Sequence, residues 1–382
     1  DIVNSIKSSL QNWEFAILVL FFGSLTFSVF SAPFVFPALY FFLHLQIYAL
    51  FGFYAFSQIN FFSEFPKILR IFAILAFFQS TLGICQWVAK GSIFDNYLFF
   101  GEQPYSISTP GIAKTSLGGV SHVLPYGTFR HPNTLAGFLV FCLLFILGSK
   151  PKNKIYYSVV FLSFLCLLLT FSFTGLISLF LGLMILFFPK KHVKTLCFLA
   201  FLAGIAGTAI LILTSYFLIQ SRNSSLLTNN FSWLTGNFPG HVFVTNPSIY
   251  RRGNLLLLGL HIFSLFPLFG VGLNNSLYFM DKFFVQFSLP RFVQPVHNVY
   301  LLLLAESGII SVFLLFLFFA LLFKKTFLLL EREESGKYPR LLLALLATFL
   351  FSAFFDHYLL TSQQILLLFC LTVGLVLQYN SE

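Results

Sequence analysis

Long apolar stretches constrain the fold of this chain more than any other feature of its sequence. A transmembrane helix needs about 20 mostly apolar residues. A window of that length finds candidate spans near residues 14–32, 34–57, 68–89, 133–149, 155–171, 174–189, 195–219, 298–323, 340–360 and 363–379. Charged residues make up only 9% of the chain, whereas a soluble domain carries roughly 25%. The sequence therefore predicts an all-α, polytopic transmembrane helical bundle of about ten spans.

The distribution of Lys and Arg predicts the orientation of this bundle. Cytoplasmic connectors of membrane proteins are enriched in Lys and Arg, and three short connectors here, 150–154, 190–194 and 324–340, are basic. We expect these connectors and both chain ends on the cytoplasmic side. The long polar stretches 90–132 and 220–297 are then extracytoplasmic loops of a single integral membrane domain, residues 1–382. The net charge of +10 follows from this bias, so no nucleic-acid partner is implied.

One short apolar stretch tests the topology. Residues 254–266 resemble a helix, but Pro267 and Gly270 end it after about 13 residues, which is too short to cross a bilayer. Counting it as a span would also break the pattern of basic connectors. We therefore expect an interfacial or re-entrant helix within the large extracytoplasmic loop.

Polar residues gather where the predicted helices meet the extracytoplasmic side. The four groups are Arg130-His131 before the fourth span, Arg251-Arg252 before the short helix, His297-Asn298 with Glu306, and Asp356-His357 between the last two spans. Each has a structural alternative. The arginines are also suited to anchoring in lipid headgroups, Glu306 to a buried hydrogen bond that fixes helix packing, and Asp356-His357 to a capped turn.

These residue types point to chemistry on a phosphorylated substrate. Two guanidinium groups near the positive end of a helix can hold phosphate oxygens, and a neutral histidine can accept a proton from a hydroxyl. Neither extracytoplasmic loop contains a DxD, an HExxH or a close carboxylate cluster. We therefore predict no metal and no cofactor, and expect arginine to neutralise a pyrophosphate.

The motif His297-Asn298-x2-Leu301-x4-Glu306-x-Gly308, preceded by Arg251 and by Phe266–Gly272, resembles the O-antigen ligase and O-antigen polymerase superfamily. The stretches 127–133 and 356–363 are similar to that family as well. The resemblance implies a metal-independent glycosyltransferase of the bacterial cytoplasmic (inner) membrane with an extracytoplasmic active site. Such enzymes move a glycan from undecaprenyl pyrophosphate to a hydroxyl on a glycan, a lipid or a protein.

The resemblance also implies roles for individual residues. His297 would activate the acceptor hydroxyl, Arg251 with Arg252 would hold the pyrophosphate, and Asn298 and Glu306 would orient the site. Supporting positions are His131, Asp356 and His357. Relatives often carry Ser-Arg where this chain has Ser172-Phe173, and we expect Arg130 to substitute for that missing arginine.

The sequence leaves several readings open. Ligase and polymerase share these motifs, and we favour a polymerase or general glycan transfer because nothing identifies a lipid acceptor. Membrane lipids are expected partners in every case. A transporter or flippase of lipid-linked sugars is an alternative, although the sequence shows no duplicated half with paired broken helices. A non-catalytic scaffold for envelope assembly is the other.

Overall fold

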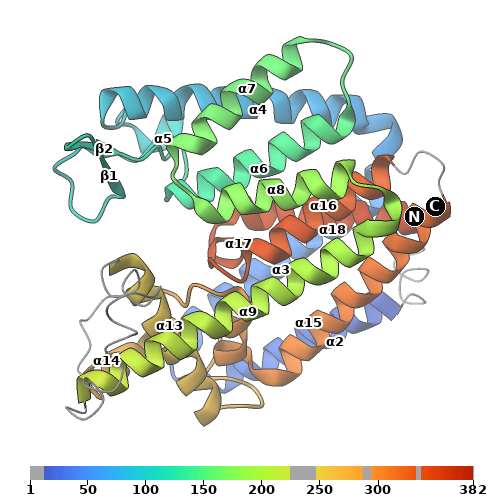
Figure 1. Cartoon of the computed structure of the whole chain (residues 1–382). Helices are drawn as coiled ribbons and strands as arrows, with labels where there is room; N and C mark the ends of the chain where they lie inside the picture. Colours follow the sequence, from blue (N-terminus) through green and yellow to red (C-terminus); the bar gives the residue numbers. More distant parts are fainter. Residues whose placement is uncertain (1–12, 224–246, 287–293, 333–336, 382) are drawn as a thin grey trace. The chain divides into compact units, whose positions relative to one another are not determined.

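The computed structural model describes residues 13–223, 247–286, 294–332 and 337–381, and most of them lie in helices (Figure 1). The strands found there are β1 (Lys114–Leu117) and β2 (Val120–Val123), which form one antiparallel hairpin. The predicted all-α polytopic fold is confirmed. Six helices in the described part are long and apolar enough to cross a membrane, and four shorter apolar helices account for the other predicted spans.

The helices that match the predicted spans are α2 (Trp13–Phe30), α3 (Val35–Gln58), α4 (Phe61–Ala89), α6 (Pro132–Ser149), α7 (Ile155–Leu169), α8 (Phe173–Phe187), α9 (Lys190–Asn223), α15 (Val299–Arg332), α16 (Lys337–Ser352) and α18 (Gln363–Ser381). The remaining helices are α5 (Tyr97–Phe100), α13 (Pro247–Leu265), α14 (Ser276–Gln286) and α17 (Tyr358–Thr361). Helix α13 is longer than the predicted short helix 254–266, with 19 residues instead of about 13. It begins seven residues earlier and ends at Leu265, two residues before Pro267, because proline cannot continue the hydrogen-bond ladder.

The chain divides into two compact units. The first unit comprises residues 1–50, 201–322 and 353–357, and the second unit comprises residues 51–200, 323–352 and 358–382. Each unit has its own buried apolar core. We describe each unit by itself.

Helix α6 forms the centre of the second unit. Nearly every one of its residues is buried, and α4, α7, α8 and α16 pack around it (Figure 1). The rings of Phe141 and Phe145 lie against Phe72 of α4 with centroid separations of 4.8 and 5.3 Å. A helix that is apolar on all sides is stable only when other helices or lipid surround it, which explains this central position.

Two glutamines of α4 fix the segment that leads into α6. The Gln86 side-chain oxygen accepts hydrogen bonds from the backbone N–H groups of Tyr126 and Gly127, at 3.0 and 2.7 Å. The Gln79 oxygen accepts one from the N–H of Thr128 at 3.0 Å. Pro132 opens α6, as the sequence predicted, because proline suits the first helical position.

The predicted span 340–360 is interrupted. Helix α16 ends at Ser352, and residues 353–357 are not helical before α17 begins at Tyr358. The carbonyl oxygen of Ala353 instead accepts a hydrogen bond from the N–H of Val299, at 2.8 Å. This contact between distant parts of the sequence competes with continuation of the helix, and apolar composition alone could not reveal it.

Candidate active site

The start of α15 is held in place by Asn298, which caps the helix. Its side-chain oxygen accepts a hydrogen bond from the N–H of Leu301 at 2.9 Å, the usual interaction of a helix N-cap. Its side-chain nitrogen donates to the carbonyl of Phe354 at 2.9 Å and to the hydroxyl of Thr208 at 3.1 Å. One buried amide therefore joins α15, α9 and the segment 353–357.

These hydrogen bonds of Asn298 bring His297 next to Asp356 and His357, which lie about sixty residues later in the chain. The Nδ1 atom of His297 lies 3.7 Å from Oδ1 of Asp356, and the two imidazole rings meet edge to face with centroids 4.7 Å apart. Asp356 is only 4% exposed, and its Oδ1 also accepts a hydrogen bond from the N–H of His357 at 2.8 Å. The first unit thus contains a histidine–carboxylate–histidine cluster, which we call the histidine cluster.

Each ring nitrogen of His297 lies near a possible hydrogen-bond acceptor. Nε2 lies 3.2 Å from the side-chain oxygen of Gln294, and Nδ1 lies 3.7 Å from the carboxylate of Asp356. The ring proton can therefore sit on Nε2, facing Gln294, or on Nδ1, facing Asp356.

Arg252 acts on the same cluster. Burial lowers the pKa of His357, the positive charge of Arg252 lowers it further, and the carboxylate of Asp356 acts in the opposite direction. His357 is therefore neutral at pH 7. Arg252 is partly buried, whereas its neighbour Arg251 is exposed.

Helix α13 carries both arginines and is anchored by an apolar core. Leu255, Leu258 and Ile262 pack with Met280 and Phe283 of α14, and Ala305 of α15 joins the same cluster. The two arginines precede this anchored part of α13 by about one turn. This packing therefore fixes the part of α13 from which the two arginine side chains extend.

Glu306 accepts hydrogen bonds from residues at the start of α14. Its carboxylate accepts hydrogen bonds from the N–H of Asn274 at 2.8 Å, from the N–H of Ser276 at 3.3 Å and from the hydroxyl of Ser276 at 2.6 Å. These bonds satisfy N–H groups at the start of α14 that have no partner within the helix. Glu306 thus orders the loop between α13 and α14.

The two glycine-containing motifs cross in direct backbone contact. The N–H of Gly272 donates to the carbonyl of Glu306 at 3.0 Å, and the N–H of Ile309 donates to that of Pro267 at 2.8 Å. A Cβ at Gly308 would lie 2.1 Å from the carbonyl oxygen of Leu268, so no other residue fits there. This crossing holds the Phe266–Gly272 and Glu306–Gly308 motifs against each other.

Arg130 and His131 belong to the second unit. His131 caps α6, since its Nδ1 accepts a hydrogen bond from the N–H of Asn133 at 3.1 Å, and Arg130 is exposed. Phe173, where relatives often have arginine, is the first residue of α8 and is 77% exposed. The predicted proximity of Arg130 to His297 involves both units and stays a prediction.

Three polar residues of the first unit were not singled out from the sequence. Gln294 and Thr208 contact His297 and Asn298, respectively. Asn254 of α13 is completely buried, and within the described residues neither its side-chain oxygen nor its nitrogen has a hydrogen-bond partner. The position of Asn254, in the apolar run 254–266, was the sequence signal that could have identified this residue.

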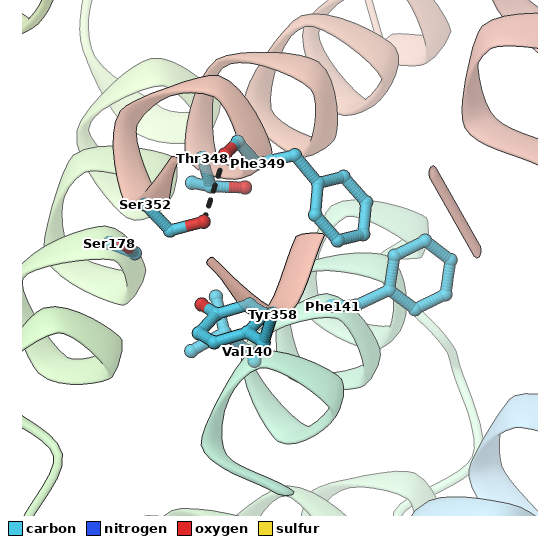
Figure 2. A pocket seen from close by; sticks show the side chains of 8 residues that line it. Val140, Phe141, Ser178, Thr348, Phe349, Ser352 and Tyr358 are labelled. Carbon is cyan, nitrogen blue, oxygen red and sulfur yellow. Dashed lines mark hydrogen bonds between the residues drawn. The ribbon is translucent and has the colours of Figure 1, made fainter. Parts of the chain in front are cut away.

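The second unit contains a small polar cavity. It has a volume of about 10 Å³, roughly the space of one water molecule, and Figure 2 shows Ser178, Thr348, Ser352 and Tyr358 around it. The buried hydroxyl of Ser178 has no hydrogen-bond partner among the described residues. None of the predicted site residues lines this cavity.

The first unit therefore presents a histidine–carboxylate cluster, with the charge of Arg252 on α13 acting on His357, within a multi-pass helical membrane protein. A family model for O-antigen ligase matches residues 158–316, a stretch that includes Arg251, Arg252, His297, Asn298 and Glu306. This match supports membership of the chain in the O-antigen ligase superfamily. No curated protein sequence matches the chain.

Proposed function

We propose that this protein is a glycosyltransferase that moves a glycan from undecaprenyl pyrophosphate to an acceptor hydroxyl at the outer face of the cytoplasmic membrane. The observation that carries this proposal is the placement of His297 beside the Asp356 carboxylate, at 3.7 Å. A carboxylate next to an imidazole orients the ring and stabilises its protonated form. The family match adds the substrate class, a lipid-linked glycan.

In the reaction, His297 acts as the general base. Asp356 draws the ring proton to Nδ1, which leaves Nε2 free to take the proton of the acceptor hydroxyl. The acceptor oxygen then forms a bond to the anomeric carbon, and the bond from that carbon to the pyrophosphate oxygen breaks. Gln294, which now occupies the hydrogen-bonding position of Nε2, would be displaced by the acceptor.

The leaving pyrophosphate needs positive charge. Arg251 is exposed on α13 and is suited to hold phosphate oxygens in a bidentate manner. Arg252, whose charge already acts on His357, would complete the site, and Arg130 would take the role of the arginine that Phe173 replaces. In this proposal arginine neutralises the leaving group and no metal is required.

Asn298 and Glu306 act by positioning. Asn298 holds His297 against the segment 353–357, and Glu306 orders the loop that follows α13. Neither needs to touch the substrate for this role. Their loss is expected to disturb structure and turnover together.

The test is glycan transfer in reconstituted vesicles, with an undecaprenyl-pyrophosphate oligosaccharide as donor. We expect His297→Ala and Arg251→Ala to lower the rate by about 100-fold or more, and His44→Ala to retain it. EDTA should leave the wild-type rate unchanged. Growth of a glycan chain in the absence of a lipid or protein acceptor would identify a polymerase.

Two results would favour the alternatives. Movement of the lipid-linked glycan across the bilayer without new bonds would indicate a transporter or flippase. Folded wild type without turnover on any acceptor class, together with function of His297→Ala in cells, would indicate a scaffold. Either result would refute the proposal.

Arg130 has its own test, because it belongs to the second unit. Cysteines introduced at Arg130 and Arg251 should be joined by a short bifunctional thiol reagent if both line one substrate cavity. A pair at Lys114 and Arg251 provides the control, since Lys114 lies on β1 of the hairpin. Equal yields for the two pairs would remove Arg130 from the proposed pyrophosphate site.

A further inference from the structure

The histidine cluster has a second chemical capacity. His297, Asp356 and His357 each offer one ligand atom, and these three atoms lie within 4.8 Å of one another. We infer that these residues bind one zinc ion reversibly, and that the zinc-bound protein is inactive. Zinc binding stands by itself, whereas the inhibition rests on the proposed function.

The geometry is close to that of a zinc site. Zinc binds nitrogen and oxygen ligands at about 2.0–2.2 Å in a tetrahedron, which places ligand atoms about 3.5 Å from one another. The separation between Nδ1 of His297 and Oδ1 of Asp356 is already 3.7 Å. All three ligand atoms lie within 4.8 Å of one another, so adjustments of about 1 Å complete the set, and the fourth position stays open for water.

The donor types select the metal. Two imidazole nitrogens and one carboxylate oxygen are the ligand set of many zinc sites. Magnesium and calcium prefer six or more oxygen ligands, which these residues do not supply. The inference therefore concerns a transition-metal ion and is compatible with turnover that needs no divalent cation.

Neighbouring groups prepare the ligands. In the tautomer that carries its proton on Nε2, facing Gln294 at 3.2 Å, the Nδ1 lone pair of His297 can bind the metal. The N–H of His357 holds the carboxylate of Asp356 at 2.8 Å. Such second contacts orient metal ligands and raise affinity. Since Arg252 places positive charge near His357, binding is expected to be weaker than at a structural zinc site.

Zinc at this position would block the base. A metal on Nδ1 requires the remaining proton of the ring on Nε2, and that nitrogen can then no longer accept the proton of an acceptor hydroxyl. The ion also neutralises the carboxylate that would stabilise the imidazolium form. Transfer should therefore fall as the zinc site fills and recover when a chelator removes the ion.

The experiment uses purified full-length protein in lipid nanodiscs, freed of metal with a chelator and titrated with zinc by calorimetry. We expect one ion per chain and an affinity at least about tenfold lower in Asp356→Asn and His357→Gln. Substitution of His44, which hydrogen-bonds the Tyr40 carbonyl of its own helix, should leave the affinity unchanged. Cobalt, used as a coloured substitute, should show the visible absorption of a tetrahedral site in the wild type and in the His44 variant, and not in Asp356→Asn or His357→Gln.

The outcomes separate the two proposals. Absence of saturable zinc binding, or equal binding by wild type and by folded Asp356→Asn and His357→Gln, overturns the inference. An equal loss of affinity in His44→Ala overturns it as well, because binding would then be diffuse. Saturable zinc binding by a protein that has no transferase activity even when free of zinc supports the zinc site and refutes the proposed transferase function. Active protein that binds zinc and stays active refutes the inhibition.

Discussion

Replacement of Asn298 by alanine gives the most direct test of how the site is assembled. The substitution removes the N-cap of α15, which costs about 1 kcal/mol. It also removes the hydrogen bonds that Asn298 donates to Phe354 and Thr208, each of which contributes about 1 kcal/mol. We expect a loss of about 3 kcal/mol in the free energy of unfolding, or about 6–12 °C in melting temperature.

The matched variants separate these contributions. Asn298→Ser keeps an oxygen that can cap α15 but lacks the donated bonds, so its loss should be about 2 kcal/mol. Thr208→Val removes the bond from Asn298 and the longer one, 3.5 Å, that the Thr208 hydroxyl donates to the Phe354 carbonyl, and should cost about 1 kcal/mol. Melting is followed by intrinsic fluorescence at one fixed scan rate, because membrane proteins commonly unfold irreversibly.

Transfer is measured on the same samples below their melting temperatures. If Asn298 positions His297, transfer should decline in the order Thr208→Val, Asn298→Ser, Asn298→Ala. A melting temperature for Asn298→Ala within about 2 °C of the wild type would refute the reasoning. Equal destabilisation by Asn298→Ser and Asn298→Ala would show that the cap alone matters.

Four further substitutions probe buried contacts of the first unit. Gly308→Ala should prevent folding, because the new Cβ would lie 2.1 Å from the Leu268 carbonyl oxygen and Gly308 has a φ of 75°; the yield of monodisperse protein measures this. Glu306→Ala should lower the free energy of unfolding by about 3 kcal/mol, since three hydrogen bonds of about 1 kcal/mol each are lost, and Ser276→Ala by about a third as much, as thermal melts will show. Asn254→Leu should leave the melting temperature unchanged or raise it, because a buried amide without partners is costly.

The Gly308→Ala prediction has a control variant, and each of the predictions has an outcome that would contradict it. Gly23→Ala in α2, where nothing lies within 4 Å of the new Cβ, should be neutral or stabilising by about 0.5–1 kcal/mol. Well-folded Gly308→Ala would contradict the backbone crossing. Full stability of Glu306→Ala would show that the loop before α14 does not depend on the carboxylate. A clear loss of stability in Asn254→Leu would mean that water hydrogen-bonds Asn254 in solution.

The membrane-spanning helices could be predicted well because their signal is local. A run of apolar residues must be helical in lipid, where every backbone polar group needs an internal partner, and α2, α3 and α6 begin within a few residues of the predicted positions. The early end of α16 at Ser352 could not be predicted. It depends on hydrogen bonds to Asn298 and Val299, which lie more than fifty residues earlier in the chain.

The residues of the candidate site could be predicted from the sequence, but the contacts between them could not. His297, Asn298 and Glu306 stood out as polar residues at the start of an apolar helix, and Asp356-His357 as a separate polar turn. Nothing in the local pattern indicated that His297 faces Asp356 rather than Glu306. Glu306 is engaged by Asn274 and Ser276 instead, because the crossing at Gly308 brings that loop over it.

The bond between Val299 and the Ala353 carbonyl has a consequence for the order in which the protein is made. Synthesis proceeds from the N-terminus, so His297 leaves the ribosome well before residues 353–357 exist. Until those residues emerge, the start of α15 lacks its partner carbonyls and His297 lacks Asp356. Under the proposed function, a nascent chain would therefore not act on lipid-linked glycans through most of its insertion, and activity would arise late, with the final helices.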